Sequence, residues 1–178
     1  MRLKTWLESR EGEISDRWMQ ELRLSEGCQG GGNQEILETV ARHLVSFLPS
    51  CFGERRERGL EVWQNATHLY GSLALRRGLA AGEVVEELQL LREVILRLFL
   101  QEGVPDTPGK EPEKTIPHME FLTLNRVLDR GVSRANVSYV DELFFAHLQG
   151  SGVPEGITDE VAGEMFRQLE LFKEELGS

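Results

Sequence analysis

Apolar residues recur every third or fourth position along most of this chain, which is the spacing of an amphipathic α-helix. No segment shows the sustained alternation of apolar and polar residues that is typical of a half-buried β-strand. Segments rich in glycine or proline interrupt the helical pattern, and residues 103–117 hold four of the six prolines. The pattern predicts an all-α domain of about six helices, at approximately residues 3–24, 34–49, 60–77, 81–101, 119–148 and 158–176.

Three residues in this pattern predict details of helix geometry. Asn33 follows a glycine-rich segment and is typical of a helix N-cap. Gly78 ends the third helix, where glycine commonly caps the C-terminus, and Gly131 predicts a bend within the fifth helix. Aromatic residues at helical spacing are expected in the core rather than in a ligand cage: Trp6, Trp18, Trp63 and Tyr70.

Length and composition fit one globular domain with a sizeable core, since 40% of the 178 residues are hydrophobic and 28% are charged. The net charge of −10 repels phosphate backbones and anionic lipids, so we expect neither nucleic acid nor a membrane as a partner. No apolar run is long enough to span a bilayer, and the N-terminal segment lacks the apolar core of a signal peptide. These features predict a cytoplasmic protein.

Sequence patterns that support catalysis or metal binding are missing. There is no His-Glu-x-x-His pair and no Gly-x-Ser-x-Gly elbow. The segment Gly27–Asn33 is rich in glycine but lacks the Lys-Ser/Thr pair of a phosphate-binding loop, so we interpret it as a connector. Cys28 and Cys51 are too few and too far apart for a disulfide framework or a zinc site. We therefore predict no enzymatic activity, no catalytic residue, and no bound cofactor or metal.

Two alternatives depend on histidines. Thr67–Ser72, Thr-His-Leu-Tyr-Gly-Ser, is similar to the accepting helix of histidine phosphotransfer domains, which reads roughly His-x-Leu-Lys-Gly-Ser. In that alignment Thr67 takes the place of the accepting histidine, and His68 lies about 100° farther around the helix. Phosphotransfer through His68 stays an alternative function. A haem or small-ligand sensor is another, because three histidines lie on predicted helices: His43, His68 and His147.

A different resemblance covers about residues 1–150. The third helix ends in Gly78-Leu79, and Val84-Val85-Glu86-Glu87 and Leu91-Arg92 follow it. Downstream, the segment LNRVLDRGVSRANVSYVDEL carries Leu128-Asp129, Ala135 and Tyr139, and Trp18 lies in an opening segment SDRWMQEL. In this arrangement the chain resembles the N-terminal regulatory domain of RsbR-type stressosome proteins, which also precedes many bacterial sensor kinases. It departs from that pattern at Ala74, where the family often has an arginine.

The resemblance implies a globin-like helical bundle without haem, which acts as a dimeric input module and modulates a C-terminal output module of kinase or stressosome type. On this basis residues 1–152 form the sensory domain, and residues 153–178 form a linker or signalling helix. The residues that match the family's structural motif are Gly78, Glu87, Leu91, Arg92, Asp129 and Tyr139. Glu87 and Arg92 are five positions apart and cannot pair along one helix, so each either bonds to a neighbouring helix or faces solvent.

The last helix carries apolar residues at alternating spacings of three and four, which is the a/d repeat of a coiled coil. These residues are Ala162, Met165, Leu169, Phe172 and Leu176. An amphipathic helix that docks on its own bundle would show the same pattern over two heptads. We favour a seam between two chains, because a helix at the C-terminus is a direct route to an output module. The sequence therefore predicts a homodimer with this helix in the interface.

Overall fold

The computed structural model describes residues 3–24, 34–103, 118–150, 152 and 156–177. Within these ranges it contains six α-helices, one short 3₁₀ helix and no strand, which confirms the all-α prediction. The helices are α1 (Leu3–Leu24), α2 (Gln34–Phe47), the 3₁₀ helix η2 (Leu48–Cys51), α3 (Arg56–Arg76), α4 (Ala81–Gly103), α5 (His118–Leu148) and α6 (Asp159–Gly177).

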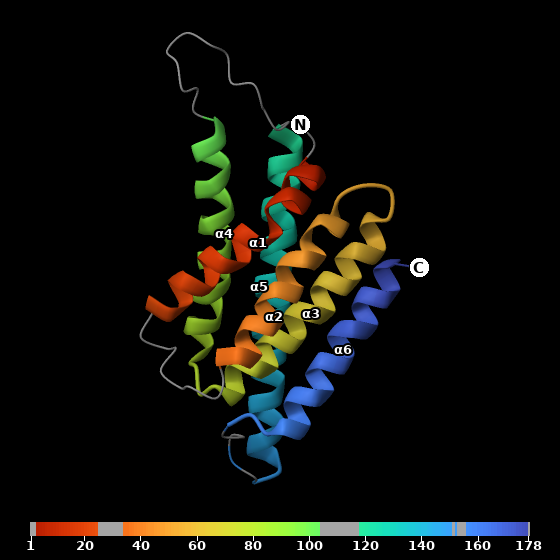
Figure 1. The fold of residues 1–178 in the computed structure, drawn as a ribbon. Coiled ribbons are helices and arrows are strands. Elements are labelled where there is room, and N and C mark those ends of the chain that lie inside the picture. Colours follow the sequence, from red (N-terminus) through yellow and green to blue (C-terminus); the bar gives the residue numbers. More distant parts are fainter. Residues whose placement is uncertain (1–2, 25–33, 104–117, 151, 153–155, 178) are drawn as a thin grey trace.

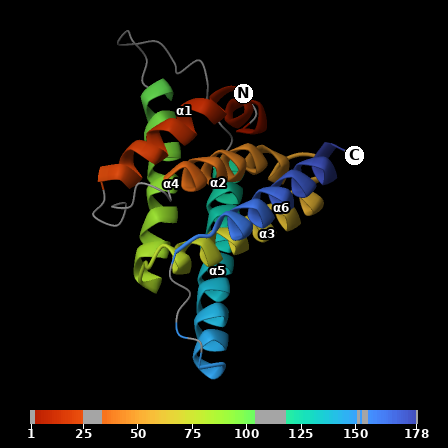
Figure 2. The ribbon, with the colours of Figure 1, turned by 60° about the horizontal axis from the view of Figure 1, so that its bottom comes forward.

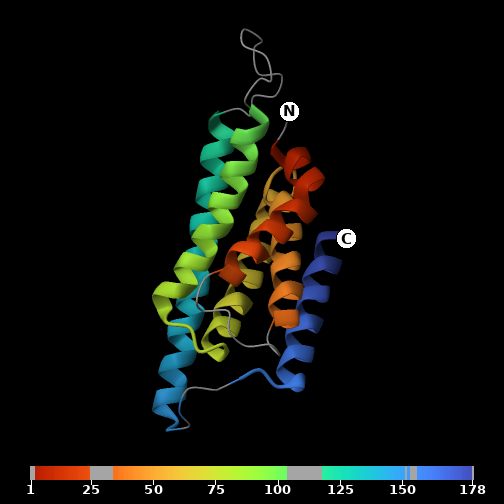
Figure 3. The same cartoon turned by 60° about the vertical axis from the view of Figure 1, so that its left-hand side comes forward.

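The longest helix, α5, organises the bundle. Helix α1 crosses over α2 and α4 on one side of the molecule (Figure 1), and α6 lies along α2 and α3 (Figure 2). Helices α4 and α5 run antiparallel as a pair, which Figure 3 shows from the side. Helix α3 also packs along α5, in the same direction, because Trp63 meets Val127 near the start of the contact and Gly71 meets Ala135 farther on.

Aromatic side chains fill the centre of the bundle. Trp6, Trp18, Trp63 and Tyr70 are all fully buried, which confirms that they belong to the core. The ring of Trp18 stacks on that of Tyr70, with 5.7 Å between the ring centroids. The indole nitrogen of Trp63 donates a 2.9 Å hydrogen bond to the carbonyl of Val127, so its polar atom is paired despite its burial.

Two glycines allow α3 and α5 to approach closely. A Cβ atom at Gly71 would lie 2.1 Å from the carbonyl oxygen of Ala135, so only glycine fits between the two backbones there. A Cβ atom at Gly131 would lie 2.8 Å from the indole nitrogen of Trp63. Helix α5 runs without interruption through Gly131. This glycine leaves room for the tryptophan ring.

Helix α6 turns its apolar face towards the core of its own chain. The five residues of the a/d repeat are buried or partly buried against that core: Ala162, Met165, Leu169, Phe172 and Leu176. At the edge of the contact, the Nε2 atom of His43 lies 3.2 Å from the Glu170 carboxylate. Within its own chain this face of α6 contacts α2 and α3. A two-heptad apolar face suits a second chain or its own bundle, so the seam between two chains stays a prediction.

The segment after residue 152 does not stand apart from the rest of the described chain. The amide of Gly156 donates a hydrogen bond to the carbonyl of Arg76, and α6 shares its core with α2 and α3. The boundary predicted between residues 152 and 153 thus joins two segments that contact one another. Among the described residues, no helix combines the length and the hydropathy that crossing a bilayer requires.

Candidate functional site

A buried ion pair lies between the end of α3 and helix α4. Arg77 donates through both terminal guanidinium nitrogens to the two carboxylate oxygens of Glu87, at 2.7 and 2.8 Å. The side chains of Arg77 and Glu87 are only 5% and 6% exposed. The hydroxyl of Tyr70 donates a third hydrogen bond, of 2.6 Å, to the same carboxylate. This bidentate geometry compensates in part for the loss of hydration of both charges.

The same cluster reaches helix α1. The indole nitrogen of Trp18 donates a 2.8 Å hydrogen bond to the backbone carbonyl of Glu87, while its ring stacks on Tyr70. Burial, followed by the neighbouring Glu87 carboxylate, raises the pKa of the Tyr70 phenol well above its ordinary value. Tyr70 therefore stays protonated and donates its hydrogen bond throughout the physiological range. The cluster connects α1, α3 and α4 through groups that face the interior.

Gly78 ends α3 and forms the turn that leads to α4. This glycine has a φ of +78°, and its amide bonds to the carbonyl of Leu75, while the amide of Leu79 bonds to the carbonyl of Ala74. These two bonds form a Schellman motif, which confirms Gly78 as the C-terminal cap. From α5, the hydroxyl of Tyr139 donates a 2.6 Å hydrogen bond to the carbonyl of Leu79. The turn is thereby fixed to α5.

Arg92 and Asp129 make a second connection between α4 and α5. Their side chains form an ion pair across the two antiparallel helices, and the Asp129 side chain is 61% exposed. Solvent screens such a pair, so it contributes little to stability and instead marks the register of the two helices. Leu91, beside Arg92, is fully buried. The sequence left two alternatives for Glu87 and Arg92, a bond to a neighbouring helix or exposure to solvent. Both residues bond to a neighbouring helix.

The six residues of the family-like motif therefore lie around the contacts of α3, α4 and α5. They are Gly78, Glu87, Leu91, Arg92, Asp129 and Tyr139. Each has a role in capping, packing or pairing helices. Sequence analysis did not identify Arg77 and Tyr70 as partners of Glu87, nor the exposed apolar face of α5.

That face lies at the C-terminal end of α5. Tyr139 contacts the turn before α4, so α4, which begins at Ala81, does not continue alongside the last turns of α5. In Figure 2 these turns extend beyond the other helices. Six large apolar side chains remain exposed there, and we call them the α5 stripe: Val137, Val140, Leu143, Phe144, Phe145 and Leu148. An exposed apolar patch of this kind is typical of an interaction surface.

His68 lies in a different environment from that of a phospho-accepting histidine. Its Nδ1 atom is buried without a hydrogen-bond partner. Burial and then Arg134 lower the pKa of His68, against the opposing effects of Glu142 and Asp141, so the ring favours the neutral form. Thr67, Gly71 and Ser72 are buried, with Gly71 against the backbone of α5. The small residues of this segment thus serve the packing of α3 against α5.

We expect His68 to accept no phosphoryl group, because α5 covers the face of α3 that a receiver domain would have to approach. The protein is incubated with a phosphorylated receiver domain and, separately, with a small phosphodonor, and its intact mass is measured. A known phosphotransfer domain, treated in parallel, is the positive control. An added phosphoryl group that disappears in His68→Gln would make phosphotransfer the leading function.

The other two histidines do not face the aromatic core. The Nδ1 atom of His43 lies 2.8 Å from the carbonyl of Thr39, and its Nε2 atom faces Glu170 at the edge of α6. His147 is exposed on the last turn of α5. An axial haem ligand must face a large apolar pocket. In this structure the stacked rings of Trp18 and Tyr70 occupy the interior between α1, α3 and α4. Neither His43 nor His147 is therefore placed as an axial haem ligand would be.

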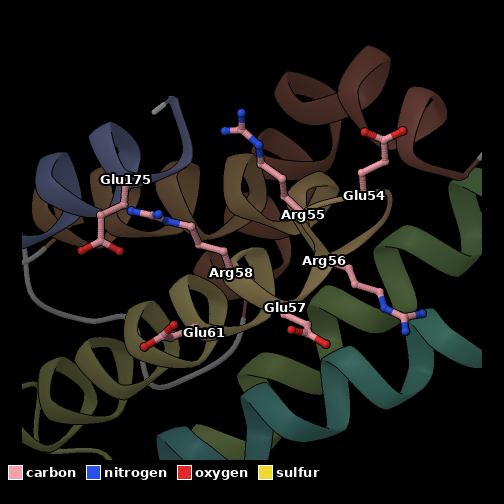
Figure 4. Close-up of a pocket in the computed structure, with 7 residues that line it drawn as sticks. All are labelled: Glu54, Arg55, Arg56, Glu57, Arg58, Glu61 and Glu175. Atoms are coloured by element: carbon pink, nitrogen blue, oxygen red, sulfur yellow. The ribbon is translucent and has the colours of Figure 1, made fainter.

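The charged segment before and within the first turns of α3 borders a wide surface hollow of about 890 Å³. Its lining residues are Glu54, Arg55, Arg56, Glu57, Arg58, Glu61 and Glu175. Three arginines and four glutamates nearly balance in charge. Figure 4 shows the arginine side chains pointing in different directions, so they do not converge on a single anion. The hollow is a solvated surface between α3 and α6.

Cysteine and metal chemistry have little support within the described residues. Burial raises the pKa of the Cys51 thiol to about 12, so this cysteine stays protonated and unreactive at neutral pH. No three His, Cys, Asp or Glu side chains gather as a metal site in this part of the chain. Cys28, the glycine-rich segment around it and the N-cap predicted at Asn33 lie outside the described residues.

Comparisons with protein-family models, with curated proteins and with solved structures give no match for this chain.

Proposed function

We propose that this chain is a cytoplasmic regulatory input module of signal transduction, without catalysis of its own, which modulates a C-terminal output module of kinase or stressosome type. The observation that carries the proposal is the exposed apolar α5 stripe on a helix that is firmly held by its own bundle. The resemblance to RsbR-type regulatory domains is the basis for the kind of output module that we propose. We propose that the module acts through a partner that binds the α5 stripe.

The anchoring of α5 favours regulation through this helix. Tyr139 fixes it to the α3–α4 turn, Arg92 pairs with its Asp129, and Gly71 brings α3 against its backbone. A change in the packing of α1, α3 or α4 would therefore move α5 as a unit, since packed helices shift as rigid bodies. The exposed stripe lies at the far end of the same helix. A partner bound to the stripe would therefore be displaced when the packing of the bundle changes.

A fusion tests this function. Residues 1–178 replace the input domain of a cytoplasmic sensor histidine kinase, and autophosphorylation is measured for the fusion and for two variants of it. Phe144→Asp places a charge on the α5 stripe, where the side chain is 58% exposed. The control, Leu171→Asp, changes an apolar residue of similar exposure, 51%, on α6. Because coupling between sites typically amounts to 1–3 kcal/mol, we expect Phe144→Asp to change the activity about five-fold or more.

Equal autophosphorylation in the unmodified fusion and in the Phe144→Asp fusion would contradict a regulatory role for α5. Equal changes in both variants would also contradict it, because the effect would then not depend on the α5 stripe. Thermal unfolding of the isolated variants checks that each remains folded. Both positions are exposed, so substitution leaves the core unchanged.

A further inference from the structure

The outward side of α5 changes character along its length. Its C-terminal half carries the α5 stripe, in which Val137 and Phe144 lie on one side of the helix. Upstream of Val137, the same side carries three exposed arginines, which we call the basic row: Arg126, Arg130 and Arg134. These arginines follow one another at spacings of four, so a positively charged row leads directly into an apolar one.

The basic row has no acidic partner among the described residues. None of its three arginines forms an ion pair with a carboxylate there. The neighbouring carboxylate on α5, that of Asp129, already pairs with Arg92 of α4. Acidic residues outnumber Lys and Arg by 30 to 20 in the whole chain, so the basic row is a local exception to an acidic surface.

An open groove between α3 and α5 joins the basic row to the α5 stripe. Its volume is about 280 Å³, and its lining residues are Gln64, Asp129, Arg130, Ser133, Arg134 and Val137. Val137 also belongs to the stripe, so the groove and the stripe form one continuous surface. Arg130 and Arg134 are one helical turn apart, which places a carboxylate in this groove within reach of both guanidinium groups.

We propose that the α5 stripe and the basic row together bind a helix of another protein, whose contact face is apolar at one end and carries carboxylates at the other. This inference rests on the proposed function and names the chemistry of the partner. The apolar end packs on the stripe, and the carboxylates bind the basic row. From Arg126 to Leu148 the surface is about 33 Å long, which matches a partner helix of about 22 residues.

The shape of this surface favours a helix over an extended segment. The side chains that form it recur at spacings of three and four along α5, and a second helix presents its own side chains at the same spacing. An amphipathic helix therefore packs along the whole row, as helices do in apolar grooves. An extended segment binds instead by adding to the edge of a sheet, and the described residues contain no strand.

The net charge of −10 does not exclude an acidic partner segment. At physiological ionic strength an exposed charge is largely screened beyond about 8 Å, so the arginines in contact with the bound helix dominate over acidic residues elsewhere. Asp141 lies beside the apolar half of the surface and disfavours a carboxylate there. The charges of α5 thus predict that the acidic residues of the partner lie only opposite the basic row.

The area of the surface predicts a reversible complex. Phe144 and Phe145 are 58% and 59% exposed, and together they present on the order of 200 Å² of aromatic surface. A stable interface of standard size buries about 800 Å² on each partner, and one face of a single helix offers less. We therefore expect a dissociation constant on the order of micromolar or weaker.

Fluorescence anisotropy with two labelled helical peptides tests this inference on residues 1–178. The first peptide, of about 22 residues, carries leucines along one half of a face and glutamates along the other half. The second has lysine in place of each glutamate. We expect the glutamate peptide to bind at least about ten-fold more tightly, because three ion pairs replace three repulsive contacts. The variant Arg126→Glu/Arg130→Glu/Arg134→Glu should reverse this preference.

Matched variants separate the charge of the surface from the charge of the chain. The control Arg42→Glu/Arg55→Glu/Arg58→Glu changes the net charge equally at exposed positions outside α5, and it should keep the preference for the glutamate peptide. Phe144→Asp should weaken binding of that peptide at least about ten-fold, since a charge without a partner would be buried in the contact. Leu171→Asp should leave the binding unchanged. Circular dichroism checks that each variant remains helical.

Failure of the glutamate peptide to bind, or equal binding of both peptides, would overturn the proposal. Sedimentation equilibrium of the chain alone tests a second copy as the occupant. Self-association that Phe144→Asp abolishes would assign the α5 stripe to that copy and would also overturn it. If the peptides show no preference and Phe144→Asp still changes the activity of the kinase fusion, only the chemistry of the partner is wrong and the proposed function stands.

Discussion

Replacing Arg77 by leucine is expected to lower the free energy of unfolding by about 3–5 kcal/mol, the cost of leaving one partner of a buried ion pair without its counter-charge. The Glu87 carboxylate would remain buried and would keep its hydrogen bond from the Tyr70 hydroxyl. Urea unfolding, followed by far-UV circular dichroism, measures the change.

Two controls distinguish the charge from the packing of this cluster. The double variant Arg77→Leu/Glu87→Leu removes both charges, so it should be more stable than Arg77→Leu alone. Tyr70→Phe keeps the ring that stacks on Trp18 but removes one hydrogen bond, and it should cost about 1–3 kcal/mol. If Arg77→Leu unfolds at the same urea concentration as the unmodified chain, the ion pair does not contribute to stability.

The periodic pattern of the sequence predicted the helices well because most of them bury one continuous face. The predicted end of the third helix was correct, since Gly78 has both the position and the conformation of a C-terminal cap. The aromatic core was also predicted correctly from residue type and spacing. These features depend on local chemistry, which a single sequence displays directly.

Features that depend on the neighbour of a helix could not be predicted in the same way. The a/d repeat of residues 162–176 is equally suited to a second chain and to the surface of α2 and α3, and the structure shows the latter. The contact of Gly131 with the ring of Trp63 joins residues that are far apart in sequence, so the pattern of α5 alone could not predict it.

The α5 stripe was missed for a related reason. The C-terminal half of α5 is apolar around much of its circumference, so its sequence pattern does not show which side other helices cover. Whether Phe144 is covered depends on where α4 begins, which the apolar pattern of α5 does not reveal. The Arg77–Glu87 pair likewise joins residues ten positions apart across a turn, beyond the spacing at which a helix pairs its own side chains.

Replacing Gly71 by alanine is expected to destabilise the protein by about 1–3 kcal/mol or more, the usual cost of extra atoms in a packed interior. The new methyl group would lie 2.1 Å from the carbonyl oxygen of Ala135 and 2.8 Å from its carbonyl carbon. These are backbone atoms, so no side-chain rotation can relieve the overlap, and α3 and α5 would have to separate. Urea unfolding again measures the loss of stability.

A matched variant gives this prediction its sharpest form. Gly12 lies within α1, is exposed, and has no atom within 4 Å of the position of a Cβ. Alanine there should stabilise the chain by about 0.5–1 kcal/mol, because alanine favours the helix over glycine. The same substitution in two helices should thus change stability in opposite directions. Stabilisation by Gly71→Ala would show that the two backbones are not in close contact in solution.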